Sequence, residues 1–153
     1  MSPKKMLISK NGDILGKAVL ADSNIIIASL DSNHPDFSKA EDLLTEVQDL
    51  HLKIVLTDLI LSEVSTFLLH NSLFEELYAL FDLIEENQLE IIPFENGKLS
   101  QAKEIIKERS NGKISFCDYY SMILIKSSNR YYKKAILSLD EHFKGSRLFI
   151  DVK

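Results

Sequence analysis

The sequence has no tryptophan, one cysteine, three prolines and five glycines among its 153 residues. The single thiol, Cys117, cannot form a disulfide within the chain, and it cannot supply the several thiolates of a zinc ribbon or an iron–sulfur cluster. No apolar run reaches the about 18 residues of a membrane span, and the first residues lack the apolar run of a signal peptide. These absences predict a protein of the reducing cytoplasm that does not contact a membrane.

The composition that remains is that of one globular domain with a single core. Hydrophobic residues make up 45% of the chain and charged residues 27%. The net charge of −5 argues against holding nucleic acid by bulk charge. The charge is uneven, because residues 52–99 hold 2 basic and 9 acidic side chains, whereas residues 100–153 hold 11 basic and 6 acidic ones. This asymmetry is either an ordinary fluctuation of a solvated surface or a basic rim that guides a polyanion to an acidic site. The rim would comprise Lys103, Lys107, Arg109, Lys113, Lys126, Arg130, Lys133 and Lys134.

Short apolar segments alternate with segments of helical periodicity. The apolar runs predict strands at residues 18–21, 53–56, 89–92 and 134–139, with a short fifth strand at 148–150. The spacing of apolar residues predicts helices at 35–50, 58–70, 72–86, 98–108 and 116–127, the second of them capped by Thr57. Near the start of the chain, Asn11-Gly12 between apolar residues indicates a hairpin. The alternation predicts an α/β fold with a mostly parallel sheet, whose functional site lies at the carboxyl ends of the strands.

Four acidic residues stand at or near this predicted edge. Asp22 and Asp140 follow the first and fourth strands, while Glu63 and Asp118 lie in helical segments with apolar neighbours. Taken singly, Asp118 has the ordinary explanation of an N-cap, Glu63 that of a surface position, and the other two that of turn caps. Four converging carboxylates without a Lys or Arg would repel one another unless a divalent cation bound them. Oxygen ligands favour Mg²⁺, or Mn²⁺, over Zn²⁺.

The order and spacing of these residues resemble the PIN-domain family, the small metal-dependent ribonuclease fold that includes VapC-type toxins. The resemblance covers about residues 18–150. It departs in two places, because Ser138 stands where the family more often has Thr, and because residues 1–17 precede the usual start. The matching segments are, in order, Asp22-Ser23-Asn24, Leu61-Ser62-Glu63-Val64, Phe116-Cys117-Asp118-Tyr119 and Ser138-Leu139-Asp140-Glu141-His142-Phe143.

The resemblance implies a single PIN-type α/β/α domain over residues 18–153 with a central, mostly parallel sheet, preceded by an extension at 1–17. It also implies roles for the acidic residues. Asp22 and Asp118 would bind Mg²⁺ or Mn²⁺ directly, and Glu63 and Asp140 would be further ligands or position water. The remaining two site residues, Asn24 and Ser138, would orient these carboxylates by hydrogen bonds.

The function implied is hydrolysis of RNA phosphodiester bonds by a metal-activated water, most simply by the toxin of a type II toxin–antitoxin pair. The family implies a small antitoxin partner and a homodimer, for which the apolar helices at 58–86 offer a surface. Two alternatives stay open: an RNA-processing PIN nuclease without an antitoxin, and a PIN-like interaction module without catalysis. A receiver-type phosphoacceptor fits less well, because Asp22 is followed by Ser23 rather than by a second acid.

Other reactive or aromatic residues have weaker claims. Cys117 has no obvious His partner and is interpreted as a packing residue. His142 follows Asp140 and is interpreted as part of a surface turn. The pairs Tyr119-Tyr120 and Tyr131-Tyr132 either pack in the core or stack bases beside the neighbouring lysines.

Overall fold

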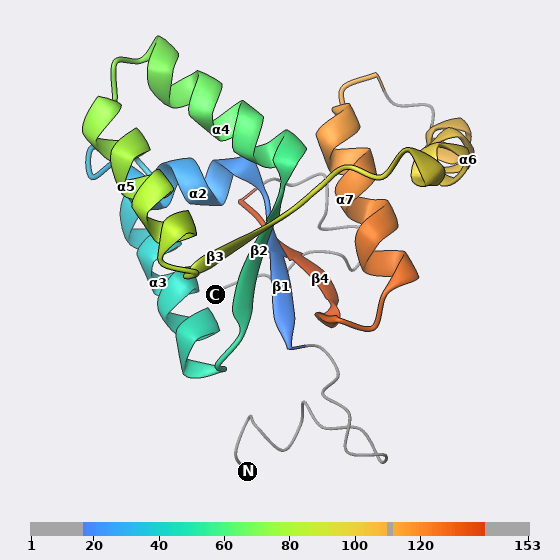
Figure 1. Cartoon of the computed structure of the whole chain (residues 1–153), viewed down its shortest axis with the longest axis horizontal. Helices are drawn as coiled ribbons and strands as arrows, with labels where there is room; N and C mark the ends of the chain where they lie inside the picture. Colours follow the sequence, from blue (N-terminus) through green and yellow to red (C-terminus); the bar gives the residue numbers. More distant parts are fainter. Residues whose placement is uncertain (1–16, 110–111, 140–153) are drawn as a thin grey trace.

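The computed structural model describes residues 17–109 and 112–139, and Figure 1 shows how their helices and strands are arranged. The hairpin predicted near Asn11-Gly12, the fifth strand predicted at 148–150, and both Asp140 and His142 lie outside the described residues.

The centre of the molecule is a parallel sheet. Its four described strands stand in the order β3-β2-β1-β4. The strand β1 pairs in parallel with β2 and β4, and β2 pairs in parallel with β3. The predicted α/β fold with a mostly parallel sheet is confirmed. The strands are β1 (Ala18–Ala21), β2 (Lys53–Thr57), β3 (Leu89–Ile92) and β4 (Tyr131–Leu137).

Four helices cover one face of this sheet and form the larger part of the core. Val19 and Ala21 of β1 and Leu56 of β2 point into this layer, where they pack against buried aliphatic side chains of the helices. In Figure 1 these helices lie to the left of the strands and above them. They are α2 (Ser23–Leu30), α3 (Phe37–Asp49), α4 (Asp58–His70) and α5 (Phe74–Glu85).

The other face is covered by α6 (Leu99–Arg109), which follows the short turn η1 (Asn96–Lys98), and by α7 (Phe116–Ser127). The alternate residues of the strands, such as Leu20 of β1, point into this second layer. Residues 118–125 of α7 are all buried, which explains why this segment is apolar nearly all round. Among the described residues, no helix combines the length and the apolar character that crossing a bilayer requires.

Helix ends follow local chemistry closely. The Oγ1 of Thr57 accepts a hydrogen bond from the Ile60 N–H at 3.1 Å, so the predicted cap of α4 is confirmed. The main difference from the sequence prediction is α2. The sequence analysis predicts no helix over the isoleucine run at 25–27, whereas the structure has one there. Isoleucine has only a modest helix propensity, but burial of these residues between the sheet and the neighbouring helices overrides it. The strand β4 also begins three residues earlier than predicted.

Candidate functional site

The carboxyl ends of the parallel strands meet the first turns of several helices at one edge of the sheet. In Figure 1 the strands run toward the upper edge, where α4 and α7 both begin. Asp22 follows β1 and is the N-cap of α2, while Ser138 follows β4. Asp118 lies in the first turn of α7, and Glu63 lies in the second turn of α4. The fold therefore brings three of the four predicted acids to the same edge, and the fourth lies outside the described residues.

Asp22 is held by hydrogen bonds on both carboxylate oxygens. Its Oδ1 accepts from the Ser23 N–H at 2.8 Å, which caps α2. Its Oδ2 accepts from the Ser138 hydroxyl at 3.0 Å and from the Asn24 amide at 3.3 Å. The Asn24 Oδ1 accepts in turn from the Leu139 N–H at 3.0 Å, which ties α2 to the end of β4. The two residues predicted to orient a carboxylate thus contact Asp22 directly.

The electrostatic state of Asp22 is set mainly by its neighbours and by burial. Only 4% of its surface is exposed. Burial, followed by the negative charge of Asp118, raises the pKa of Asp22 from 3.8 to about 7. The charge of Glu63 raises the pKa further, whereas the hydrogen bonds from Ser23 and Ser138 lower it. Asp22 is therefore surrounded by like charge that its hydrogen bonds only partly offset.

Asp118 is also buried, with 8% of its surface exposed. Its side chain does not cap α7, because the cap is Ser115, whose Oγ accepts from the Asp118 N–H at 3.2 Å. The interpretation of Asp118 as an ordinary N-cap is therefore wrong. Asp22, by contrast, does cap a helix, so the ordinary explanation of a capping residue is correct for Asp22.

Glu63 lies on the exposed side of α4, yet it is tied to the site. The Ser23 hydroxyl donates a hydrogen bond of 2.7 Å to Glu63 Oε1, a contact that the sequence analysis did not assign. Cys117 stands beside the same carboxylate. Burial, a hydrogen bond with Glu63 and the surrounding acids raise the pKa of the Cys117 thiol to about 12. Since the thiolate is the nucleophilic form, Cys117 is unsuited to nucleophilic chemistry.

The donor set fits a hard divalent cation. It consists of carboxylate, amide and hydroxyl oxygens, which are the ligands that Mg²⁺ and Mn²⁺ take. The raised pKa of Asp22 reflects burial first and then repulsion from Asp118 and Glu63, and a bound cation would offset both. Within residues 17–109 and 112–139, however, no three His, Cys, Asp or Glu side chains are grouped closely enough to hold an ion by themselves. The described residues therefore supply part of the predicted four-acid site.

The positions of the tyrosines decide between the two interpretations of the Tyr pairs, in favour of packing. Tyr119, Tyr120 and Tyr131 are buried in the core and so cannot stack on a base as that interpretation required. Phe116, which the sequence analysis did not single out, is 40% exposed and lies in the same helical turn as Asp118. Its position as the first residue of α7 was the only available signal.

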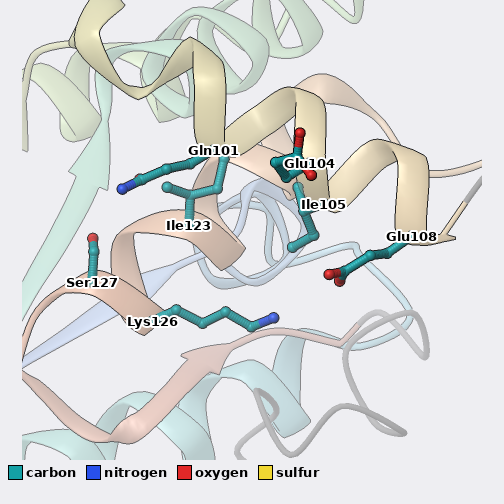
Figure 2. Close-up of a pocket in the computed structure, with 7 residues that line it drawn as sticks. All are labelled: Gln101, Glu104, Ile105, Glu108, Ile123, Lys126 and Ser127. Carbon is teal, nitrogen blue, oxygen red and sulfur yellow. The ribbon is translucent and has the colours of Figure 1, made fainter.

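A separate cavity of about 390 Å³ lies on the flank of the molecule, between α6 and α7 (Figure 2). Figure 2 shows side chains of both helices around it, and none belongs to the predicted acid site. The lining mixes two acids, one lysine, two isoleucines and two neutral polar residues. They are Gln101, Glu104, Ile105, Glu108, Ile123, Lys126 and Ser127.

Comparison with known proteins gives a consistent picture. A family model of the PIN domain matches residues 19–145, which is most of the chain. Among solved structures, the fold is similar to that of VapC20 from Mycobacterium tuberculosis, described as a toxin that cleaves the sarcin–ricin loop. The TM-score is 0.73 at 14% sequence identity, and the match covers 89% of this chain and 99% of that one. No curated protein sequence matches this chain.

Proposed function

The chain belongs to the PIN-domain family, and we propose that it is a divalent-metal-dependent endoribonuclease that hydrolyses RNA phosphodiester bonds. The observation that carries the proposal is the surroundings of Asp22. This carboxylate is buried at the carboxyl edge of a parallel sheet, and the negative charges of Asp118 and Glu63 act on it there. Parallel sheets bind their ligands at this edge, and a cluster of acids there suits a cation that in turn binds phosphate.

The proposed site assigns a task to each residue. Asp22 and Asp118 would bind the ion directly, with Glu63 and Asp140 as further ligands or water-positioning groups. A divalent ion bound there would lower the pKa of a bound water and stabilise negative charge on the leaving oxygen. Ser138 and Asn24 hold Asp22 Oδ2 in one orientation before a substrate arrives. No covalent nucleophile is required, which agrees with the inert thiol of Cys117.

We further propose that the protein acts in the cytoplasm as the toxin of a toxin–antitoxin pair. The support is the similarity in fold to a chain described as an RNA-cleaving toxin. The alternative is an RNA-processing PIN nuclease without an antitoxin, and a small reading frame overlapping this gene would favour the toxin. An antitoxin or a second copy of the chain would find an exposed apolar surface on α4 and α5. That surface comprises Phe67, Leu69, Phe74, Tyr78 and Phe81.

The proposal is tested by Mg²⁺ and Mn²⁺ calorimetry combined with RNA cleavage on the same samples. Asp22→Asn and Asp118→Asn each remove one charge at nearly constant shape, and we expect both to lose metal binding and metal-dependent cleavage. Asp42→Asn, on an exposed face of α3, changes the net charge equally and serves as the control. A wild type that binds no metal, or site variants that cut RNA as well as it does, would refute the nuclease. The interaction module would then be the better explanation.

A further inference from the structure

Three aromatic rings form a cluster that includes the first residue of α7. Phe94, which follows β3, has its ring centroid 5.0 Å from that of Tyr120 and 6.1 Å from that of Phe116. The rings of Phe116 and Tyr120 are 6.4 Å apart and inclined by 30°, which is a stacked arrangement. The cluster is graded in burial, because Tyr120 is 1% exposed while Phe116 is 40% exposed. Phe116 therefore forms an outer layer on a buried aromatic base.

The inner rings of this cluster are fixed by backbone hydrogen bonds. The Phe94 N–H donates to Asp58 Oδ2 at 3.0 Å, and the Glu95 N–H donates to the Tyr120 hydroxyl at 2.9 Å. Asp58 begins α4 and Tyr120 lies in α7, so the segment after β3 is pinned from both sides. A platform that is rigid before binding loses little conformational entropy when a ligand stacks on it.

The exposed ring of the cluster shares a helical turn with one of the predicted metal ligands. Phe116 is the first residue of α7 and Asp118 the third, so both belong to one helical turn with a rise of about 1.5 Å per residue. Residues that are two positions apart on a helix differ by roughly 200° in direction around its axis. The side chains of Phe116 and Asp118 therefore leave α7 on nearly opposite sides. The ring therefore lies across the start of α7 from Asp118, and it leaves the space around that carboxylate open. Lys113, which is exposed, precedes the same turn and adds positive charge for a phosphate backbone.

We propose that Phe116, supported by Phe94 and Tyr120, stacks on an unpaired nucleobase of an RNA strand that passes the start of α7. This inference rests on the proposed function and adds to it a residue, Phe116, that holds an unpaired base of the RNA substrate. Aromatic stacking tolerates any base, so the ring selects single-stranded character and not sequence. Loss of one such stack is expected to weaken RNA binding about tenfold.

The lack of tryptophan in the chain provides a direct probe. Phe116→Trp introduces a single indole at the platform, and Ile106→Trp places one on α6 at a matched position, since Ile106 is 39% exposed. Fluorescence is followed in EDTA while an oligoadenylate of about ten nucleotides is added. We expect quenching for Phe116→Trp but not for Ile106→Trp. An abasic oligonucleotide of the same length, or a blunt RNA duplex, is expected to quench neither.

Affinity and turnover of the metal-loaded enzyme complete the test. Phe116→Leu is expected to raise Kd and KM for single-stranded RNA about tenfold with little change in kcat, whereas Phe116→Trp retains wild-type values. Equal quenching by the abasic oligonucleotide, or an unchanged Kd in Phe116→Leu, would overturn the stacking role while leaving the nuclease intact. If the Trp fluorescence is quenched by raising the protein concentration alone, a second copy of the chain covers the ring. That result would also overturn the stacking role. A wild type that neither binds nor cuts any RNA would remove both proposals.

Discussion

Replacing Asp22 by Asn is expected to stabilise the metal-free protein at neutral and higher pH. The pKa of Asp22 is raised from 3.8 in the unfolded chain to about 7 in the folded one. The folded state therefore holds its proton more tightly. The resulting stability is fully present below about pH 4 and is lost as the pH rises through about 7. A shift of about three units corresponds to at most about 4 kcal/mol at high pH, at about 1.4 kcal/mol per unit.

Asn mimics the protonated form of Asp22 and keeps most of its contacts. Its Oδ1 can still accept from the Ser23 N–H and cap α2, since Asn and Asp are equivalent caps. Its Nδ2 can donate to the Ser138 hydroxyl, but it cannot accept the Asn24 amide, which costs about 1 kcal/mol. The net gain at about pH 8 is therefore about 1–3 kcal/mol. Each kcal/mol raises Tm by about 2–4 °C in a domain of this size.

Thermal unfolding in EDTA between about pH 4 and pH 8 measures this difference. We expect the Tm of Asp22→Asn to be higher than that of the wild type at about pH 8 and slightly lower at about pH 4. Asp42→Asn, on an exposed part of α3, controls for net charge and should follow the wild type throughout. Added Mn²⁺ should raise Tm for the wild type but not for Asp22→Asn. A difference between wild type and variant that is independent of pH would refute the reasoning, because it would show that Asp22 is ionised at no cost.

Three further predictions follow from other contacts. Glu90→Gln removes a bidentate ion pair in which the Arg130 guanidinium holds the pKa of Glu90 below its usual range. Because the pair is partly exposed, chemical denaturation at neutral pH should show a loss of only about 0.5–1 kcal/mol, which shrinks in high salt and as acid protonates Glu90. Ser115→Ala removes the cap of α7 and should cost about 1 kcal/mol of stability. Calorimetry should also show weaker metal binding by this variant, because Asp118 lies in the capped turn. Ser115→Asp, which can still cap the helix, should restore the stability. Cys117→Ser should keep full cleavage activity, and since the pKa of Cys117 is raised to about 12, the native thiol should react with iodoacetamide far more slowly than in denatured protein.

Local signals were sufficient for most of the fold. Strand and helix positions on the chain follow from apolar periodicity, and the capping role of Thr57 follows from its place between a strand and a helix. The helix α2 did not follow, because its isoleucine run carries no helical periodicity when every side is buried. Burial of that kind is a property of the assembled layers and cannot be read from a window of sequence.

The site shows the same division. Asp22, Glu63 and Asp118 could be proposed from order and spacing, because parallel topology brings strand ends and helix starts to one edge. The link from Ser23 to Glu63 could not, since it joins two helices that are 40 residues apart in sequence. Phe116 was overlooked for a related reason. Its exposure depends on how α7 packs, whereas the tyrosines that looked more suitable in sequence are buried.

The two roles of Asp22 place opposite demands on its charge. As the N-cap of α2 it needs only an acceptor for the Ser23 N–H, and Asn or Ser would serve as well without repelling Asp118. The structural role therefore accounts for a polar residue at this position but not for a negative one. A charge that destabilises the empty fold becomes favourable once a cation is bound, because the repulsion is then replaced by attraction. If the proposed ion binds at Asp22, folding stability and ion binding are linked through this one carboxylate, and a substitution that stabilises the metal-free chain is expected to do so at the expense of its chemistry.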